Sequence, residues 1–143
     1  MNARGHGPGD VSAVRLRLIY AALVLMVIAA GLLWRWPGLH LPPTLAKYGG
    51  SVLWGALVYV SLRVVLPRAG VTIMVGLAAA LAAFVEFTQL LHWPWLDAFR
   101  GTPLGVLLLG RFFSWWDIAS YWLGIAGVGA ADHFCRARDR RGS

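Results

Sequence analysis

The chain has 143 residues, of which 59% are hydrophobic and only 13% are charged, and its formal net charge is +7. Soluble domains carry about 25% charged residues, so a soluble fold of this composition would leave a large apolar surface in water. The length allows one compact unit and excludes two domains of ordinary size.

The chain opens with a Gly-rich polar stretch, residues 1–13, that we expect to be a flexible cytoplasmic tail. An apolar segment follows over about 14–35. Arg15 and Arg17 in front of an apolar run are also typical of a signal peptide. The run continues to Leu33, however, and further apolar segments follow it. We therefore favour an uncleaved first transmembrane helix.

Three more apolar segments cover 49–66, 71–91 and about 115–134, and each is close to the ~20 residues that span hydrocarbon. The stretch 93–114 does not fit this scheme, because its apolar part is too short to span. It predicts a short helix that is either interfacial or re-entrant. The fold class is therefore an all-α, four-transmembrane-helix bundle over 14–134, followed by a basic cytoplasmic tail, 135–143.

The basic residues predict the orientation. With four spans and a cytoplasmic N-terminus, nine of the 13 Lys and Arg fall on the cytoplasmic side, which agrees with the positive-inside rule. We expect a multi-pass protein of the bacterial inner membrane with both termini cytoplasmic. A spanning helix at 103–113 would place the C-terminal arginines outside. The basic tails are expected to meet anionic lipid, not nucleic acid.

Tryptophans gather near the predicted outer interface. Six of the eight lie there: Trp34, Trp36, Trp93, Trp95, Trp115 and Trp116. An aromatic belt explains them, since an indole ring with one polar N–H suits the headgroup level. A pocket for an amphiphilic ligand is the alternative.

Polar residues occur late in the third apolar segment and early in the fourth. Glu86 and Gln89 are three apart and share a helix face, while Asp117 and Tyr121 are four apart and share another. Ionisable residues near hydrocarbon usually have partners and often a function. The two faces lie at one depth, so they meet if the two helices pack together.

Glycines continue the face of Asp117 and Tyr121. Gly124 lies on it and Gly127 lies close to it. We expect both to let another helix approach closely.

Arg100 and Arg111 lie in the connecting segment at the same level. An arginine can bind a carboxylate bidentately, so one of them set against Glu86 or Asp117 would form a structural clasp. The other reading is that the arginine binds an anionic headgroup or phosphate. The two readings are compatible.

Catalytic and metal signals are weak. His6, His40, His92 and His133 are scattered without metal-ligand spacing, and the single Cys135 fits neither a disulfide nor zinc. No nucleophile with a suitable base is evident. We expect no enzyme, no cofactor and no metal.

Three motifs resemble a family of small bacterial integral membrane proteins of unknown function that looks related to the VanZ-like proteins. They are Glu86-x-x-Gln89, Arg100 after it, and Asp117-x-x-x-Tyr121-x-x-Gly124. The VanZ-like pattern has Asn where this chain has Tyr121, and Arg111 is an alternative match to the arginine. The resemblance implies an envelope-associated role and no established enzymatic activity.

The leading hypothesis is a non-enzymatic protein that binds an anionic lipid or envelope precursor at this outer polar cluster. The first alternative is an accessory subunit of a larger membrane complex, or a homo-oligomer. The second is an intramembrane enzyme acting on a lipid-linked substrate.

Overall fold

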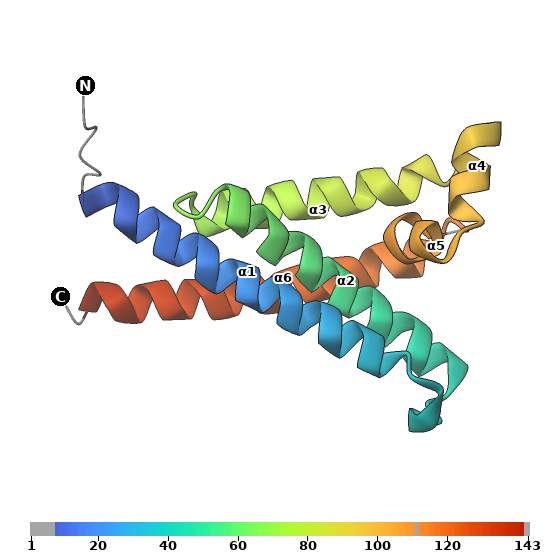
Figure 1. The fold of residues 1–143 in the computed structure, drawn as a ribbon, viewed down its shortest axis with the longest axis horizontal. Coiled ribbons are helices and arrows are strands. Elements are labelled where there is room, and N and C mark those ends of the chain that lie inside the picture. Colours follow the sequence, from blue (N-terminus) through green and yellow to red (C-terminus); the bar gives the residue numbers. More distant parts are fainter. Residues whose placement is uncertain (1–7, 111, 142–143) are drawn as a thin grey trace, which may run out of the picture.

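The computed structural model describes residues 8–110 and 112–141, which contain six α-helices, one short 3-10 helix and no strand. The helices are α1 (Pro8–Trp34), α2 (Pro43–Val65), α3 (Val71–Thr88), α4 (Pro94–Arg100), α5 (Pro103–Leu109) and α6 (Trp115–Arg141), and the 3-10 helix η1 is Pro37–Leu39. Both termini lie at one end of the bundle, and α4 and α5 lie at the other (Figure 1). We call these the N/C end and the α4/α5 end.

Three helices are long and apolar enough to cross a membrane: Ser12–Trp34 within α1, Pro43–Val65 and Val71–Thr88. α6 has 27 residues but is not in this set. The described chain is thus all-α, with three candidate spans and a long C-terminal helix.

Both predicted tails are helical where the structure describes them. α1 begins at Pro8, so 8–13 are part of a helix, while residues 1–7 lie outside the described part. α6 continues to Arg141, through most of the predicted basic tail. The segment between α3 and α6 holds two short helices instead of the predicted one, because Gly101 and Thr102 interrupt the helix. Thr102 Oγ1 accepts a hydrogen bond from Gly105 N at 3.0 Å and caps α5.

α2 is the central helix and packs against α1, α3 and α6. Its contact with α6 is the most extensive of all, and the two helices cross near the middle of the bundle (Figure 1). The apolar core between α2, α3 and α6 is made of Tyr59, Val60, Met74, Ala78, Ala82 and Ile125.

The α2–α6 contact depends on two glycines. A Cβ at Gly55 would collide with the backbone of Tyr121, and a Cβ at Gly124 would collide with the carbonyl of Val52. Small residues of this kind let helix backbones touch in a membrane, where van der Waals contact replaces the hydrophobic effect between helices. Gly55 and Gly124 therefore set the distance between α2 and α6.

Gly127 does not share this role, which corrects the expectation from the sequence. It is exposed, and no atom beyond its own helix lies within 4 Å of the Cβ it would carry. Gly129 is the buried glycine instead, close to Val75 of α3. The buried side of α6 extends from Gly124 through Ile125 to Gly129, and position 127 lies about 60° from Gly124 on the other side, outside this contact.

A second polar cluster, which the sequence did not predict, lies towards the N/C end. The Asp132 carboxylate of α6 accepts hydrogen bonds from Tyr20 Oη of α1 at 2.9 Å and from Tyr59 Oη of α2 at 2.7 Å. It forms ion pairs with Arg63 of α2, which is fully buried, and with Arg136 Nε at 3.0 Å. One carboxylate thus joins three helices.

The two arginines of this cluster also bind the α2–α3 connection. Arg63 Nη1 donates to the carbonyl of Ala69 at 2.6 Å, and Arg136 Nη2 donates to the carbonyl of Pro67 at 2.7 Å. Buried guanidinium groups are tolerable only when they are paired and hydrogen-bonded. At the N/C end, the cluster therefore joins α1, α2 and α6 to one another and to the α2–α3 connection.

The glycine contact predicts that position 124 is intolerant of a methyl group and position 127 is not. Gly124→Ala should lower stability by about 1–3 kcal/mol or more, because the added carbon meets backbone that cannot move alone. Gly127→Ala, on the same helix, should leave the thermal unfolding midpoint in detergent unchanged. Equal midpoints for the two variants would contradict the assigned packing.

Asp132→Asn should destabilise the protein by about 3–5 kcal/mol, because it leaves the Arg63 charge buried without its counter-ion. The matched control is Asp97→Asn, since Asp97 is 45% exposed and its nearest guanidinium nitrogen is 3.6 Å away. Thermal unfolding in detergent checks both. The double variant Arg63→Met, Asp132→Asn should recover part of the loss, and a double variant as unstable as the sum would argue against the pairing.

Candidate functional site

Glu86 is the centre of the polar residues at the α4/α5 end. It lies in the last turn of α3 and is fully buried. Its carboxylate accepts hydrogen bonds from Ser114 N at 2.8 Å, from Gln89 Nε2 at 2.9 Å and from Tyr121 Oη at 3.1 Å. The acid therefore joins the end of α3 to the start of α6 through three uncharged donors.

No arginine of the described residues pairs with Glu86 or Asp117, which corrects the predicted carboxylate clasp. Arg100 is buried but bonds to the end of α3: Nη1 donates to the carbonyl of Leu91 at 2.9 Å, and Nη2 to the carbonyl of Thr88 at 2.6 Å. Carbonyls at a helix C-terminus lack intrahelical partners, so a guanidinium is a suitable cap. Arg111 lies outside the described residues.

Arg100 still attaches the connecting segment to the bundle, through carbonyls instead of carboxylates. Arg100 also donates to Thr88 Oγ1 at 3.1 Å and forms an ion pair with Asp97 at 3.6 Å, while its buried Nε has no hydrogen-bond partner in the described chain. With its guanidinium engaged in this way, Arg100 is a structural cap in α4.

Gln89 is the second link between α3 and the connecting segment. It is 4% exposed, and its amide nitrogen donates to Glu86 and to the carbonyl of Leu109 at 2.6 Å. Gly110 has φ +69°, and a side chain there would meet the Gln89 amide. This glycine lets the chain leave α5 close to α3.

Asp117 faces α2 instead of an arginine. Its Oδ1 accepts a hydrogen bond from Ser51 Oγ at 3.1 Å, and its Oδ2 lies 3.4 Å from Lys47 Nζ. Asp117 is buried, while the Lys47 side chain is 53% exposed. The pair therefore extends from the bundle interior to its surface.

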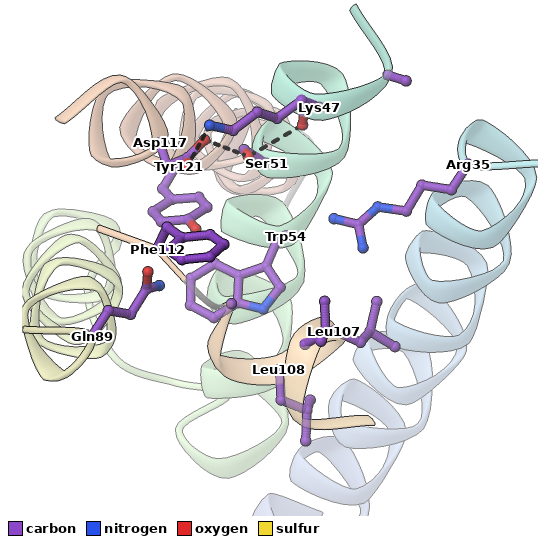
Figure 2. A pocket seen from close by; sticks show the side chains of 13 residues that line it. Arg35, Lys47, Ser51, Trp54, Gln89, Leu107, Leu108, Phe112, Asp117 and Tyr121 are labelled. Atoms are coloured by element: carbon purple, nitrogen blue, oxygen red, sulfur yellow. Dashed lines mark hydrogen bonds and ion pairs between the residues drawn. The ribbon is translucent and has the colours of Figure 1, made fainter. Parts of the chain in front are cut away.

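These residues surround a cavity of about 450 Å³ at the α4/α5 end, within the size range of small-molecule sites. We call it the polar cavity. Its polar lining residues come from four parts of the chain (Figure 2): Arg35, Lys47, Ser51, Gln89, Asp117 and Tyr121. Trp54 and the leucines of α5 form its apolar wall.

Arg35 is a cation of the polar cavity that has no partner among the described residues. It follows the end of α1 and is exposed, and no hydrogen bond or ion pair joins its side chain to a described residue. Figure 2 shows its guanidinium directed from α1 towards the side of the cavity that holds Ser51 and Trp54. The missing side chain of Gly50 leaves room for it, because a Cβ there would lie 2.9 Å from Arg35 Nε.

An apolar groove of about 230 Å³ adjoins the polar cavity. The two share four lining residues, Arg35, Trp54, Leu107 and Leu108. The groove runs between α1, α2 and α5, and its other lining side chains are mainly aliphatic: Val27, Ile28, Leu32, Leu53, Leu57 and Leu104. The polar cavity and the apolar groove thus meet at the Arg35 side chain.

Large aromatic side chains surround this end of the molecule. Trp36, Trp93, Trp95, Phe112, Trp115 and Trp116 are all more than half exposed. Such rings favour the membrane–water interface. This distribution is the one expected of a helix-bundle end at a membrane–water interface.

Sequence reasoning named four residues that the structure brings together, Glu86, Gln89, Asp117 and Tyr121, and it missed Arg35, Lys47 and Ser51. Ser51 and Lys47 lie one turn apart on α2, and a polar residue at each turn of an apolar helix was the available signal. Arg35 looked like an ordinary charge at a helix end. Among the described residues, no three His, Cys, Asp or Glu side chains are grouped to hold a metal ion.

Three apolar helices of spanning length, a long fourth helix and polar side chains turned towards the interior define a multi-pass membrane protein. Residues 40–125, more than half of the chain, match the family described as "Protein of unknown function (DUF2809)", and the chain belongs to that family. The match includes Lys47, Glu86, Gln89 and Asp117, while Arg35 precedes it. No solved structure matches this fold.

Arg100→Gln should release the α4/α5 segment from α3, because it removes charge-assisted hydrogen bonds worth about 1.5–3 kcal/mol each. Hydrogen exchange of the amides in 94–109 should accelerate by about tenfold or more, with little change in α6. Asp97→Asn is the control, since it removes only the long ion pair. Unchanged exchange in Arg100→Gln would show that other contacts hold the segment.

Proposed function

We propose that this protein binds an anionic amphiphile, a membrane lipid or a lipid-linked envelope precursor, in the polar cavity and the apolar groove. The observation that carries the proposal is Arg35, an unpartnered guanidinium at the junction of the two recesses. A guanidinium presents planar donors that match phosphate, and its side chain is well suited to an anion at a membrane surface.

The charge of the polar cavity supports an anionic ligand. Arg35 and Lys47 supply two positive charges and Asp117 supplies one negative charge. Asp117 is engaged by Ser51 and Lys47, so the positive charge of Arg35 is left uncompensated. An anion at this position would remove the imbalance.

The apolar groove supports a ligand with a hydrocarbon chain. The aliphatic side chains that line the groove come from α1, α2 and α5, and Arg35 lies at the boundary between the groove and the polar cavity. A water-soluble anion would leave these side chains without a partner. A lipid would fill the groove with its chain and place its phosphate at the guanidinium.

We propose binding without catalysis, because the two carboxylates are engaged in hydrogen bonds that hold helices together. Glu86 accepts from three donors, and Asp117 accepts from Ser51 and contacts Lys47. Neither resembles an acid or base held ready for a substrate. In this proposal, the residues that resemble the VanZ-like pattern shape the site and do not react in it.

The proposal places the site at the outer leaflet of the bacterial inner membrane, with α6 as a fourth span and both termini in the cytoplasm. The arginines at the N/C end support this orientation. The low hydropathy of α6 has a physical cause, since Asp117 faces α2 and Asp132 binds residues of α1 and α2. The opposite face of α6, with Trp122, Leu123 and Phe134, is apolar and exposed.

Arg35→Gln should weaken binding of phosphatidylglycerol by about 10- to 100-fold, because a charge-assisted hydrogen bond is worth about 1.5–3 kcal/mol. The matched control is Arg17→Gln, which removes the same charge from an exposed position at the other end of α1. Native mass spectrometry of the detergent-solubilised protein, titrated with phosphatidylglycerol and with phosphatidylcholine, measures both. Only Arg35→Gln should lose the preference for the anionic lipid.

Equal lipid retention in Arg35→Gln and Arg17→Gln would exclude the polar cavity as the anion site. The alternative of an accessory subunit or homo-oligomer would then take precedence. Its support is the outer face of α3, where Gly76 and Ala80 are exposed one turn apart and no described atom fills the space beside Gly76. Small residues at this spacing suit contact with another membrane helix.

A further inference from the structure

The polar cavity contains a hydrogen-bond acceptor that an anion alone does not satisfy. Gln89 is buried, and both hydrogens of its amide nitrogen are used by Glu86 and Leu109. These two bonds fix which end of the amide is the oxygen. Gln89 Oε1 is buried and has no hydrogen-bond partner in the described chain.

This acceptor lies on the opposite side of the cavity from Arg35. Figure 2 shows the Gln89 amide directed from α3 into the interior of the cavity, across from the guanidinium that enters from α1. Buried polar groups are nearly always paired in native structures, and an unpaired one often marks a partner not yet present. Because an amide oxygen can only accept a hydrogen bond, that partner must be a donor.

The ionised phosphate of a diester has no O–H group, so it cannot itself supply such a donor. An ammonium group could donate, but it would enter a cavity that already holds the positive charges of Arg35 and Lys47. A hydroxyl group donates without adding charge. The arrangement therefore favours a headgroup that carries one negative charge and free hydroxyl groups.

Building on the proposed function, we infer that the ligand is a lipid whose headgroup is a phosphate diester with free hydroxyls, of the phosphatidylglycerol type. Its phosphate lies at Arg35 and Lys47, its acyl chain lies in the apolar groove, and a headgroup hydroxyl donates to Gln89 Oε1. Gln89 is then the residue that determines headgroup specificity.

The test compares two lipids with identical acyl chains and equal charge. Phosphatidylglycerol has headgroup hydroxyls and phosphatidylethanol has none. In competition on the full-length protein, measured by native mass spectrometry, the wild type should prefer phosphatidylglycerol by about tenfold, as expected for one hydrogen bond to a buried acceptor.

Gln89→Met should reduce that preference to near one, and the ratio of the two lipids is the quantity compared, because the variant can change the affinity for both. Ser120→Ala is the control, because the Ser120 hydroxyl donates to the carbonyl of Trp116 and does not line the cavity. Glycerol phosphate, which lacks acyl chains, forms a third arm and should not displace the lipid at the same concentration.

The outcomes separate the two proposals. Equal binding of the two lipids by the wild type, with dependence on Arg35 retained, overturns the headgroup inference alone. Loss of the dependence on Arg35 overturns the proposed function. Displacement by glycerol phosphate overturns the assignment of the groove to an acyl chain. Because Gln89→Met also removes two structural hydrogen bonds, the wild-type ratio decides the inference if that variant does not fold.

Discussion

The close approach of α2 and α6 determines most of this structure. Lys47, Ser51, Gly55, Tyr59 and Arg63 follow one another at four-residue intervals on α2, so they form one row along the helix. At the middle of the row, Gly55 meets the α6 backbone at Tyr121 and allows contact. Towards the two ends, the polar members of the row meet the carboxylates of α6. The backbone contact at Gly55 thus brings the polar residues of α2 close enough to bind Asp117 towards one end of α6 and Asp132 towards the other.

This arrangement divides the bundle into three levels. The middle is apolar, with Met74, Ala78 and Ile125 buried between α2, α3 and α6. The N/C end holds the Asp132 cluster, in which two arginines and two tyrosines bind one carboxylate. The α4/α5 end holds two buried carboxylates, Glu86 and Asp117, which are satisfied mainly by uncharged donors and by one partly exposed lysine. The N/C cluster joins its helices through paired charges, whereas the other end keeps a cavity open among its polar residues.

The sequence predicted the helical class, the candidate spans and the meeting of Glu86 with Tyr121, because periodicity places residues on helix faces. It did not predict the Arg63–Asp132 pair. Hydropathy assigns an arginine near a helix end to water, and only the partner helix shows that Arg63 is enclosed. Arg100 was paired with the wrong groups for a related reason. Sequence spacing indicates the level of a side chain along the bundle. The carbonyls of Thr88 and Leu91, at and just after the end of α3, compete with carboxylates for the guanidinium, and only the path of α4 decides between them.

The distribution of partners explains why we propose Arg35, and not Arg100, as the residue that binds an external anion. Arg100 donates to the carbonyls of Thr88 and Leu91, so an anion would have to displace the contacts that hold α4. Arg63 is closed within the core, where its bonds fix α2 to α6. Arg35 has no such task in the described chain and stands where the polar cavity opens into the apolar groove. Binding there would cost the fold no internal bond. The same reasoning applies to Gln89, whose amide nitrogen binds Glu86 and Leu109 while its oxygen has no partner in the described chain. A site built from the groups that the fold does not use can be filled and emptied without loosening the helices around it.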